Sequence, residues 1–175
     1  PSLLLADMEK EGKSLPIAIT ETDGVELIHH DIFTNGILYL DIGFDLHAVP
    51  QNLLPYMGLF GQLLLEMGTE SEDFVKLSQR IGRDTGGIYA DTYTSTITDS
   101  NESAAYLFLR GKSTTEQASK LFEILGDVLL SVKLDNPGRF KQIVLEEKAG
   151  MESALIPSGH MVVHGRLQSK FHEAG

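Results

Sequence analysis

The chain has 175 residues, 42% of them hydrophobic. This length is typical of one domain that buries about 70% of the surface of its unfolded chain. The absence of cysteine excludes disulfide bonds and thiolate metal sites. A formal net charge of −11 argues against nucleic acid as a partner, because phosphate binding requires clustered positive charge. No stretch has the apolar length of a membrane span, so no membrane partner is expected.

The beginning of the chain predicts a linker. The first residue is Pro1 rather than methionine, so we expect the chain to be a piece of a longer protein. The residues that follow are largely polar, and we assign residues 1–16 to an interdomain linker. Residues 17–175 are then expected to form a single α+β domain.

Three strands are expected before the first helix. Two short strands, at 17–21 and 25–31, surround the turn pair Asp23-Gly24 and predict a hairpin. From 37 to 46, in ILYLDIGFDL, apolar residues alternate with other residues. This alternation is typical of a strand with one buried face.

The stretch from Leu53 to Gly87 predicts two helices joined by a turn. Its first half is apolar on every side, which is typical of a buried helix. Pro55 suits the first turn of that helix, and Gly68 suits the position after its end. Thr69 to Glu72 has the pattern of a capping box for the second helix, which we expect to end at Gly82.

The rest of the chain predicts a second hairpin and three further helices. The expected elements are strands at 88–98 and 104–110, a helix opened by a capping box at 113–116, a helix from Asn136-Pro137 to about 155, and a last, truncated helix at 158–171. Strands joined by short turns favour an antiparallel or mixed sheet, and helices that follow in pairs should cover one face of it. The predicted fold class is therefore α+β.

The order of elements and three phrases resemble a known family. A buried helix, Gly-Thr, a second helix and Gly-Gly before a strand occur in this order, and HDIFTNGILYLDIGFD (30–45) and LFLRGKS (107–113) flank them. This pattern resembles the pitrilysin/insulinase-type zinc metallopeptidases, most closely the presequence protease (falcilysin-like) branch. The resemblance implies an enzyme of four related domains, arranged as two halves around a closed chamber. This chain is similar to the first domain of the second, non-catalytic half.

The family's zinc-binding positions are substituted in this chain. In active domains the buried helix carries H-x-x-E-H shortly before the Gly-Thr. In this sequence the two histidine positions fall on Leu59 and Leu63, and the glutamate position falls on Gln62. The downstream glutamate ligand is retained as Glu147, within VLEEKAG at 144–150.

The chemistry of these substitutions predicts a domain without catalytic residues or a metal. Leucine has no lone pair for zinc, and a neutral glutamine cannot take a proton from a metal-bound water. Glu147 alone cannot hold a catalytic metal. We therefore expect no cofactor in this chain and, from the resemblance, zinc in another domain of the parent enzyme.

The resemblance implies a function for the longer protein. The parent would be a hydrolase that degrades short unstructured peptides, such as used targeting sequences, and this chain would form part of the wall of its substrate chamber. Its partners would be the other domains of the same peptidase and the peptide substrates. Its location would be soluble and intracellular, in a bacterial cytoplasm or a mitochondrial or plastid matrix. Because targeting peptides are rich in arginine, the acidic chain would also favour cationic peptides.

Two other functions are compatible with the sequence. One is a stand-alone structural or dimerisation module that shares only the fold. The other is a complete enzyme with a metal on Glu147 and a histidine such as His160. His160 and His164 have the spacing of metal ligands on a helix, but the sequence shows no third ligand beside them. The helix that should carry the chemistry is apolar, which favours the non-catalytic domain.

The remaining polar clusters have structural interpretations. His29 and His30 are adjacent on a strand and point to opposite faces, so they cannot bind one metal ion. Arg80, Arg83 and Asp84 lie near the end of the second helix, where cations offset the helix dipole. The GRDTGG stretch lacks the spacing of a phosphate loop, and no G-x-S-x-G motif supports a serine hydrolase.

Overall fold

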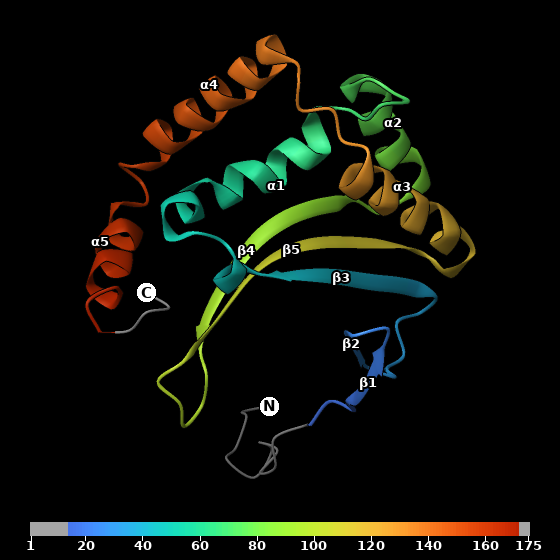
Figure 1. The fold of residues 1–175 in the computed structure, drawn as a ribbon, viewed down its shortest axis with the longest axis horizontal. Coiled ribbons are helices and arrows are strands. Elements are labelled where there is room, and N and C mark those ends of the chain that lie inside the picture. The colour runs from blue at the N-terminus through green and yellow to red at the C-terminus, as the bar shows by residue number, and fades with distance from the viewer. Residues whose placement is uncertain (1–13, 172–175) are drawn as a thin grey trace, which may run out of the picture. The chain divides into compact units, whose positions relative to one another are not determined.

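The computed structural model describes residues 14–171, and the chain divides at Gly36 into two compact units. The first unit contains one β-hairpin, and the second contains a three-stranded sheet with the helices (Figure 1). The predicted linker at 1–16 lies mostly outside the described residues. The linker and the single domain at 17–175 therefore stay predictions.

The first unit is the predicted hairpin. Strand β1 (Ala18–Thr22) pairs antiparallel with β2 (Val25–His29). Asp23 and Gly24 connect the strands with φ angles of 53° and 77°. Positive φ at both positions defines the turn whose twist matches a two-residue hairpin, and it explains the Asp-Gly pair.

The second unit is built on an antiparallel sheet with strand order β3-β5-β4. Its strands are β3 (Ile37–Asp45), β4 (Ile88–Thr96) and β5 (Ser103–Thr114). Because β5 lies in the centre, it pairs along its length with both neighbours. The predicted α+β class is confirmed.

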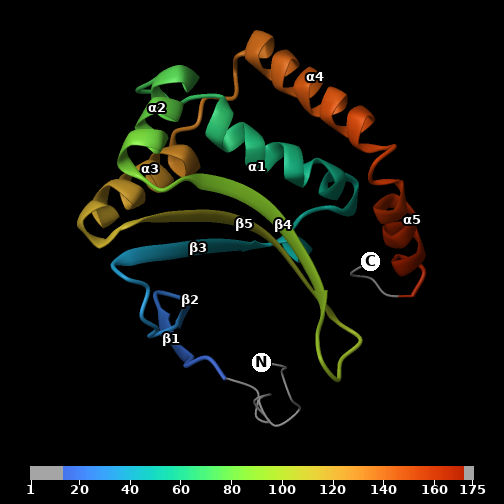
Figure 2. The same ribbon diagram turned by 180° about the vertical axis from the view of Figure 1, so that it is seen from behind.

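The helices α1, α2 and α3 cover one face of this sheet, and α4 lies on the far side of α1 (Figure 1; Figure 2 shows the same arrangement from behind). The helical segments are η2 (Leu46–Ala48), η3 (Gln51–Tyr56), α1 (Met57–Glu66), α2 (Phe74–Asp84), η4 (Thr115–Gln117), α3 (Ala118–Leu130), α4 (Pro137–Ala154) and α5 (Gly159–Gln168).

The main core lies between the sheet and the helices α2 and α3. Leu109 at the centre of β5 is 1% exposed and packs with Leu121 and Val128 of α3 and Leu77 of α2, each completely buried. The predicted alternation of β3 is confirmed, because Leu38, Leu40 and Ile42 pack against this cluster. On the other face of the sheet Phe108 stacks against Tyr106, with ring centroids 5.6 Å apart, and beneath Arg110.

The predicted buried helix is shorter and less buried than expected. Its first part is the 3-10 segment η3, in which Leu53, Leu54 and Tyr56 are 44%, 38% and 60% exposed. Only the C-terminal half of α1 is buried, at Gly61, Leu63 and Leu64. An apolar sequence therefore predicted a helix here, but did not reveal which part the described chain covers.

Both predicted capping boxes are wrong. Helix α2 is capped by Asp73, whose Oδ1 accepts a hydrogen bond from the backbone N–H of Lys76 at 2.9 Å. Thr69 instead forms a β-bridge with Val132. Ser113 belongs to β5, where it pairs with Leu38, so that strand is four residues longer than predicted. In each case strand pairing outcompetes a local side-chain cap.

The ends of two helices also follow local signals. Asn136 caps α4 by accepting a hydrogen bond from the N–H of Arg139 at 3.0 Å, with Pro137 in the first turn, as predicted. Helix α2 continues to Asp84, two residues beyond the expected end at Gly82.

Candidate functional site at the interface of α1 and α4

Two glycines set the position of α1. A Cβ atom at Gly61 would lie 2.6 Å from Cβ of Ala90 in β4, so the helix rests directly on the strand. At the end of the helix, Gly68 has a φ of 85°, and a Cβ atom there would lie 2.8 Å from the carbonyl oxygen of Glu72. A left-handed residue without a side chain is therefore required where the chain turns from α1 towards α2.

One face of α1 packs against α4 around Leu63. Leu63 is 7% exposed and forms a cluster with Met67 and with Ile143 of α4, which is completely buried. Leu59, one turn before Leu63, packs against the same cluster. Leu59 and Leu63, which match the family's two histidine positions, therefore both face α4.

Glu147 lies one helical turn after Ile143 and is half-buried. Together with Leu59, Val144 and Met151 it lines a groove of about 260 Å³ between α1 and α4. The structure thus brings Leu59, Leu63 and Glu147 to one interface, although Glu147 lies more than eighty residues further along the chain. This juxtaposition is the geometry that the matched ligand positions require.

Gln62 lies on a different side of α1. Its Nε2 donates a hydrogen bond to Oε1 of Glu66 at 3.0 Å. Both side chains line a larger cleft of about 650 Å³, whose walls are α1, α2 and the start of β4. Gln62 is among neither the residues that line the groove nor the Leu63 cluster.

The donor set at this interface does not fit zinc. Two leucines occupy the positions where lone pairs are needed, and Glu147 offers a single carboxylate. Among residues 14–171 no group of three or more His, Cys, Asp or Glu side chains is placed to hold a metal ion. His160 and His164 both lie on α5 and are exposed. We therefore derive no reaction step from a metal in this chain.

Arg139 fixes the other end of the interface. Its Nε donates to the carbonyl oxygen of Glu66 at 3.0 Å, and its Nη2 donates to Oε2 of Glu66 at 2.9 Å. Its guanidinium lies over the ring of Phe74, 4.2 Å from the centroid. The side chain is 11% exposed. No pattern in the sequence signals this contact, because its partners are far apart along the chain.

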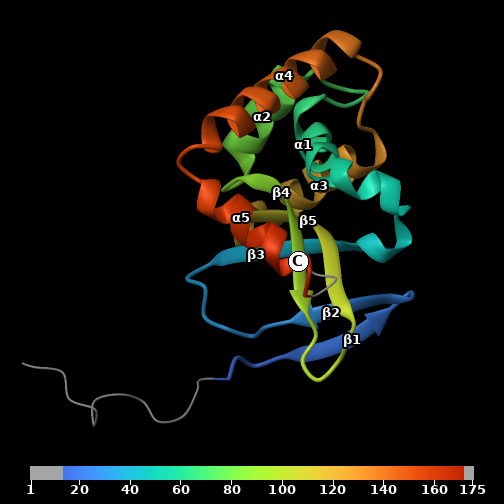
Figure 3. The same ribbon diagram turned by 90° about the vertical axis from the view of Figure 1, so that its left-hand side faces the viewer.

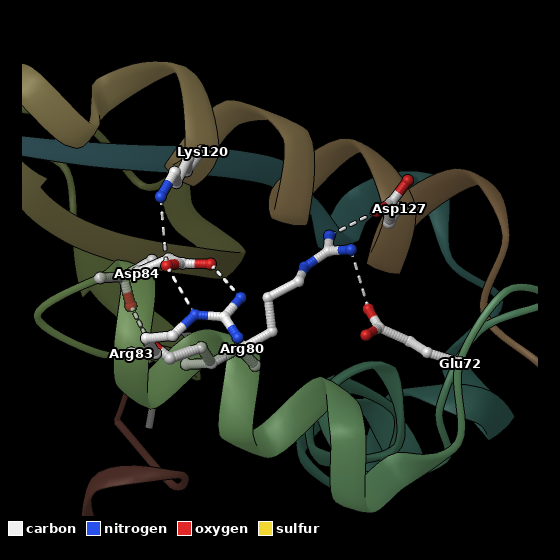
Figure 4. Close-up of polar contacts among 8 residues, drawn as sticks. Glu72, Arg80, Arg83, Asp84, Lys120 and Asp127 are labelled. Atoms are coloured by element: carbon white, nitrogen blue, oxygen red, sulfur yellow. Dashed lines mark hydrogen bonds and ion pairs between the residues drawn. The ribbon is translucent and has the colours of Figure 1, made fainter.

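A second polar cluster joins α2 to α3 (Figure 4). Arg80 of α2 forms ion pairs with Glu72, at 2.9 Å, and with Asp127 of α3. The interpretation of Arg80 as a cation that only offsets the helix dipole is therefore incomplete, because its guanidinium also connects two helices.

Asp84 is held by two cations in the same cluster. Arg83 donates hydrogen bonds to its carboxylate at 3.0 and 2.7 Å, and Lys120 of α3 donates one at 3.4 Å. Hydrogen bonding from Arg83, assisted by Lys120, lowers the pKa of Asp84 to about 2, and Asp84 in turn raises the pKa of Arg83. A carboxylate held ionised in this way is a structural tie rather than a general acid or base.

The comparisons with known proteins give the family of this chain. A peptidase-associated family, which accompanies subfamily C of the pitrilysin-type metallopeptidases, matches residues 1–175, the whole chain. The chain belongs to this family. It is 39% identical over 175 residues to presequence protease 1, chloroplastic/mitochondrial, of Arabidopsis thaliana, covering 100% of this chain and 16% of that protein. The resemblance to the presequence protease branch is confirmed.

Two further relatives have the same relation to the chain. Protein HypA of Clostridium perfringens is 35% identical over 170 residues, which are 97% of this chain and 18% of that protein. The mitochondrial presequence protease of Danio rerio is 24% identical over 164 residues, 92% of this chain and 16% of that protein. The chain thus spans less than a fifth of the length of these relatives. In the part of the chain that the structure describes, no helix could cross a membrane.

Proposed function

We propose that this peptidase-associated chain is a non-catalytic domain of a zinc metallopeptidase that degrades short unstructured peptides, and that it forms part of the wall of the substrate chamber. In this proposal the zinc is held by another domain of the same polypeptide. The parent protein works in a mitochondrial or plastid matrix or in a bacterial cytoplasm. The names of the relatives support a peptidase of this kind.

The observation that carries the proposal is the placement of Leu59 and Leu63 opposite the helix of Glu147. In this interface the two positions that match metal ligands belong to a hydrophobic contact centred on Leu63 and Ile143. Closely packed leucines stabilise the domain by hydrophobic burial, but they provide no ligand for zinc. The interface has therefore kept its role in packing and lacks the groups for catalysis.

The first test is the zinc content of the chain after chelation, re-equilibration with a slight excess of zinc, and desalting. We expect a zinc-to-protein ratio near zero, because the donor set is incomplete. A ratio near one would overturn the proposal for this domain, and His160, His164 and Glu147 would then be the first residues to replace.

A second test asks whether the matched positions are the right ones. The variant with Leu59→His, Gln62→Glu and Leu63→His, which retains Glu147, should bind about one zinc ion and gain thermal stability when zinc is added. The matched control adds Glu147→Gln and should lose most of that gain. If the triple variant folds, as judged by circular dichroism, and zinc still does not raise its Tm, the alignment of these positions is wrong.

The acidity of the chain supports a narrower proposal about substrates. A wall with a formal net charge of −11 attracts cationic peptides through long-range electrostatics. Such attraction is screened by salt, since the Debye length falls from about 10 Å at 0.1 M to about 3 Å at 1 M. Turnover of an arginine-rich peptide by the full-length enzyme should therefore fall with salt more steeply than turnover of a neutral peptide. Equal salt dependence of the two peptides would contradict this proposal.

A further inference from the structure

Helix α4 is anchored at one end only. Its first turns are held by the bonds between Arg139 and Glu66 and by the buried Ile143. The contacts 66 to 139, 63 to 143 and 59 to 147 show that α4 runs antiparallel to α1. Beyond Glu147 every residue of α4 is exposed. The interface is therefore closed near Ile143 and opens along the helix towards Leu155.

The apolar stripe of α4 continues into the open part. Met151 and Leu155 follow Val144 on the face that lines the groove, and they are 62% and 55% exposed. The facing end of α1 is also uncovered, because Tyr56 of η3 is exposed. A soluble helix normally buries such a stripe against a neighbour. This stripe meets no such neighbour among the described residues.

Helix α5 extends this uncovered surface (Figure 3). It has no buried residue, and it makes no extensive contact with another described helix or strand. Its exposed large apolar side chains are Met161, Val162, Val163 and Leu167. A helix of 10 residues is marginal by itself in water. We define the α4–α5 limb as residues 144–168.

The groove has a charge that specifies its occupant. Glu147 is half-buried on a mainly apolar surface and has no ion-pair partner within residues 14–171. Lys148 and Glu152 on its rim pair with each other at 3.6 Å. A segment that fills this groove would bury apolar side chains and would place a Lys or Arg against Glu147.

We infer that the α4–α5 limb is the docking surface for an apolar segment, with a basic residue for Glu147, from a further domain of the same longer polypeptide. This inference rests on the proposed function, in which the chain is one domain of a larger peptidase. The relatives have room for the segment, because this chain spans 16–18% of their length. A second copy of the chain is a poorer occupant, since each copy carries a formal charge of −11 and brings another Glu147 instead of a cation.

Hydrogen exchange on the full-length polypeptide, compared with the chain 1–175, tests this inference. We expect amides of residues 159–168 to exchange at least about tenfold more slowly in the full-length protein, because docking suppresses local opening. Leu155→Asp in the full-length protein should abolish this protection and leave exchange in α3 unchanged. Leu130→Asp is the matched control, because Leu130 is 89% exposed on α3 and lies outside the limb.

Three outcomes would overturn the inference. Exchange in 159–168 could be equally fast in both proteins, Leu155→Asp could leave the protection intact, or protection could arise in the chain alone as its concentration rises, which would identify a second copy as the occupant. Peptide cleavage by the unsubstituted full-length protein is measured separately. Protection of α5 in a protein without peptidase activity would support the docking surface and contradict the proposed function.

Discussion

Arg139 at the start of α4 donates two hydrogen bonds to Glu66 at the end of α1, one to its carbonyl oxygen at 3.0 Å and one to its carboxylate at 2.9 Å. The carbonyl groups in the last turn of a helix lack partners within the helix. Arg139 supplies one such partner and adds an ion pair, so a single side chain ends α1 and anchors α4. The position of Glu147 opposite α1 depends on this anchor.

Replacing Arg139 should release α4. We expect Arg139→Met to lower the free energy of unfolding by about 1–3 kcal/mol, because hydrogen bonds to charged groups are lost at a largely buried position. Urea denaturation measures this change. The matched control is Lys148→Met on the same helix, whose ion pair with Glu152 is exposed and should contribute less than about 1 kcal/mol. Equal losses in the two variants would show that Arg139 is not an anchor.

Gly68 should tolerate no side chain. Gly68→Ala should destabilise the domain by more than about 1 kcal/mol, because φ is 85° and the new Cβ would lie 2.8 Å from the backbone at Glu72 and Phe74. Gly58→Ala is the matched control within α1. Nothing lies within 4 Å of a Cβ at Gly58, so alanine there should stabilise the helix by about 0.5–1 kcal/mol. Thermal unfolding of both variants should therefore show Tm changes of opposite sign.

Asp84 should make stability depend on pH in the acid range. Its pKa in the folded protein is about 2, below its ordinary value of 3.8, so folding favours the ionised form. The contribution of Asp84 is therefore complete above about pH 4 and is lost as the pH falls towards 2. Asp84→Asn should lower Tm at pH 7 and should differ less from the unsubstituted chain as the pH approaches 2.

The control for this experiment is Asp91→Asn. Asp91 is exposed on β4 and forms no ion pair with another described residue, so its replacement changes the net charge without removing a tie between helices. If the two asparagine variants show the same dependence of Tm on pH, the contacts of Asp84 with Arg83 and Lys120 do not contribute to stability.

The features that were predicted correctly from the sequence depend on neighbouring residues. Asp23-Gly24 requires positive φ at both positions, the alternation at 37–46 has the period of a strand, and Asn136-Pro137 combines a cap with a suitable first residue. Each signal is complete within a few residues. The elements that contain them were therefore predicted close to their observed positions.

The predictions that failed depend on contacts between distant residues. Thr69 has the local pattern of a cap, but Glu70 N–H donates to the carbonyl oxygen of Ser131 at 2.9 Å, which holds this segment extended. The exposure of Leu53 depends on what lies beside it, and an apolar sequence does not show this. At the candidate site, the resemblance matched Leu59 and Glu147 to ligand positions, and only the structure showed that both line one groove.

The last prediction concerns the packing of Leu63. Leu63→His should destabilise the domain by about 2–5 kcal/mol, because it removes a buried aliphatic side chain beside Ile143 and places a polar ring in an apolar contact. Leu63→Met is the matched control and should cost less than about 1.5 kcal/mol, since it conserves volume and polarity. Denaturant unfolding in the presence of a chelator separates the packing effect from any metal binding. A loss for Leu63→His no larger than that for Leu63→Met would mean that the interface of α1 and α4 is not a packed contact, and the interpretation of the substituted ligand positions would lose its physical basis.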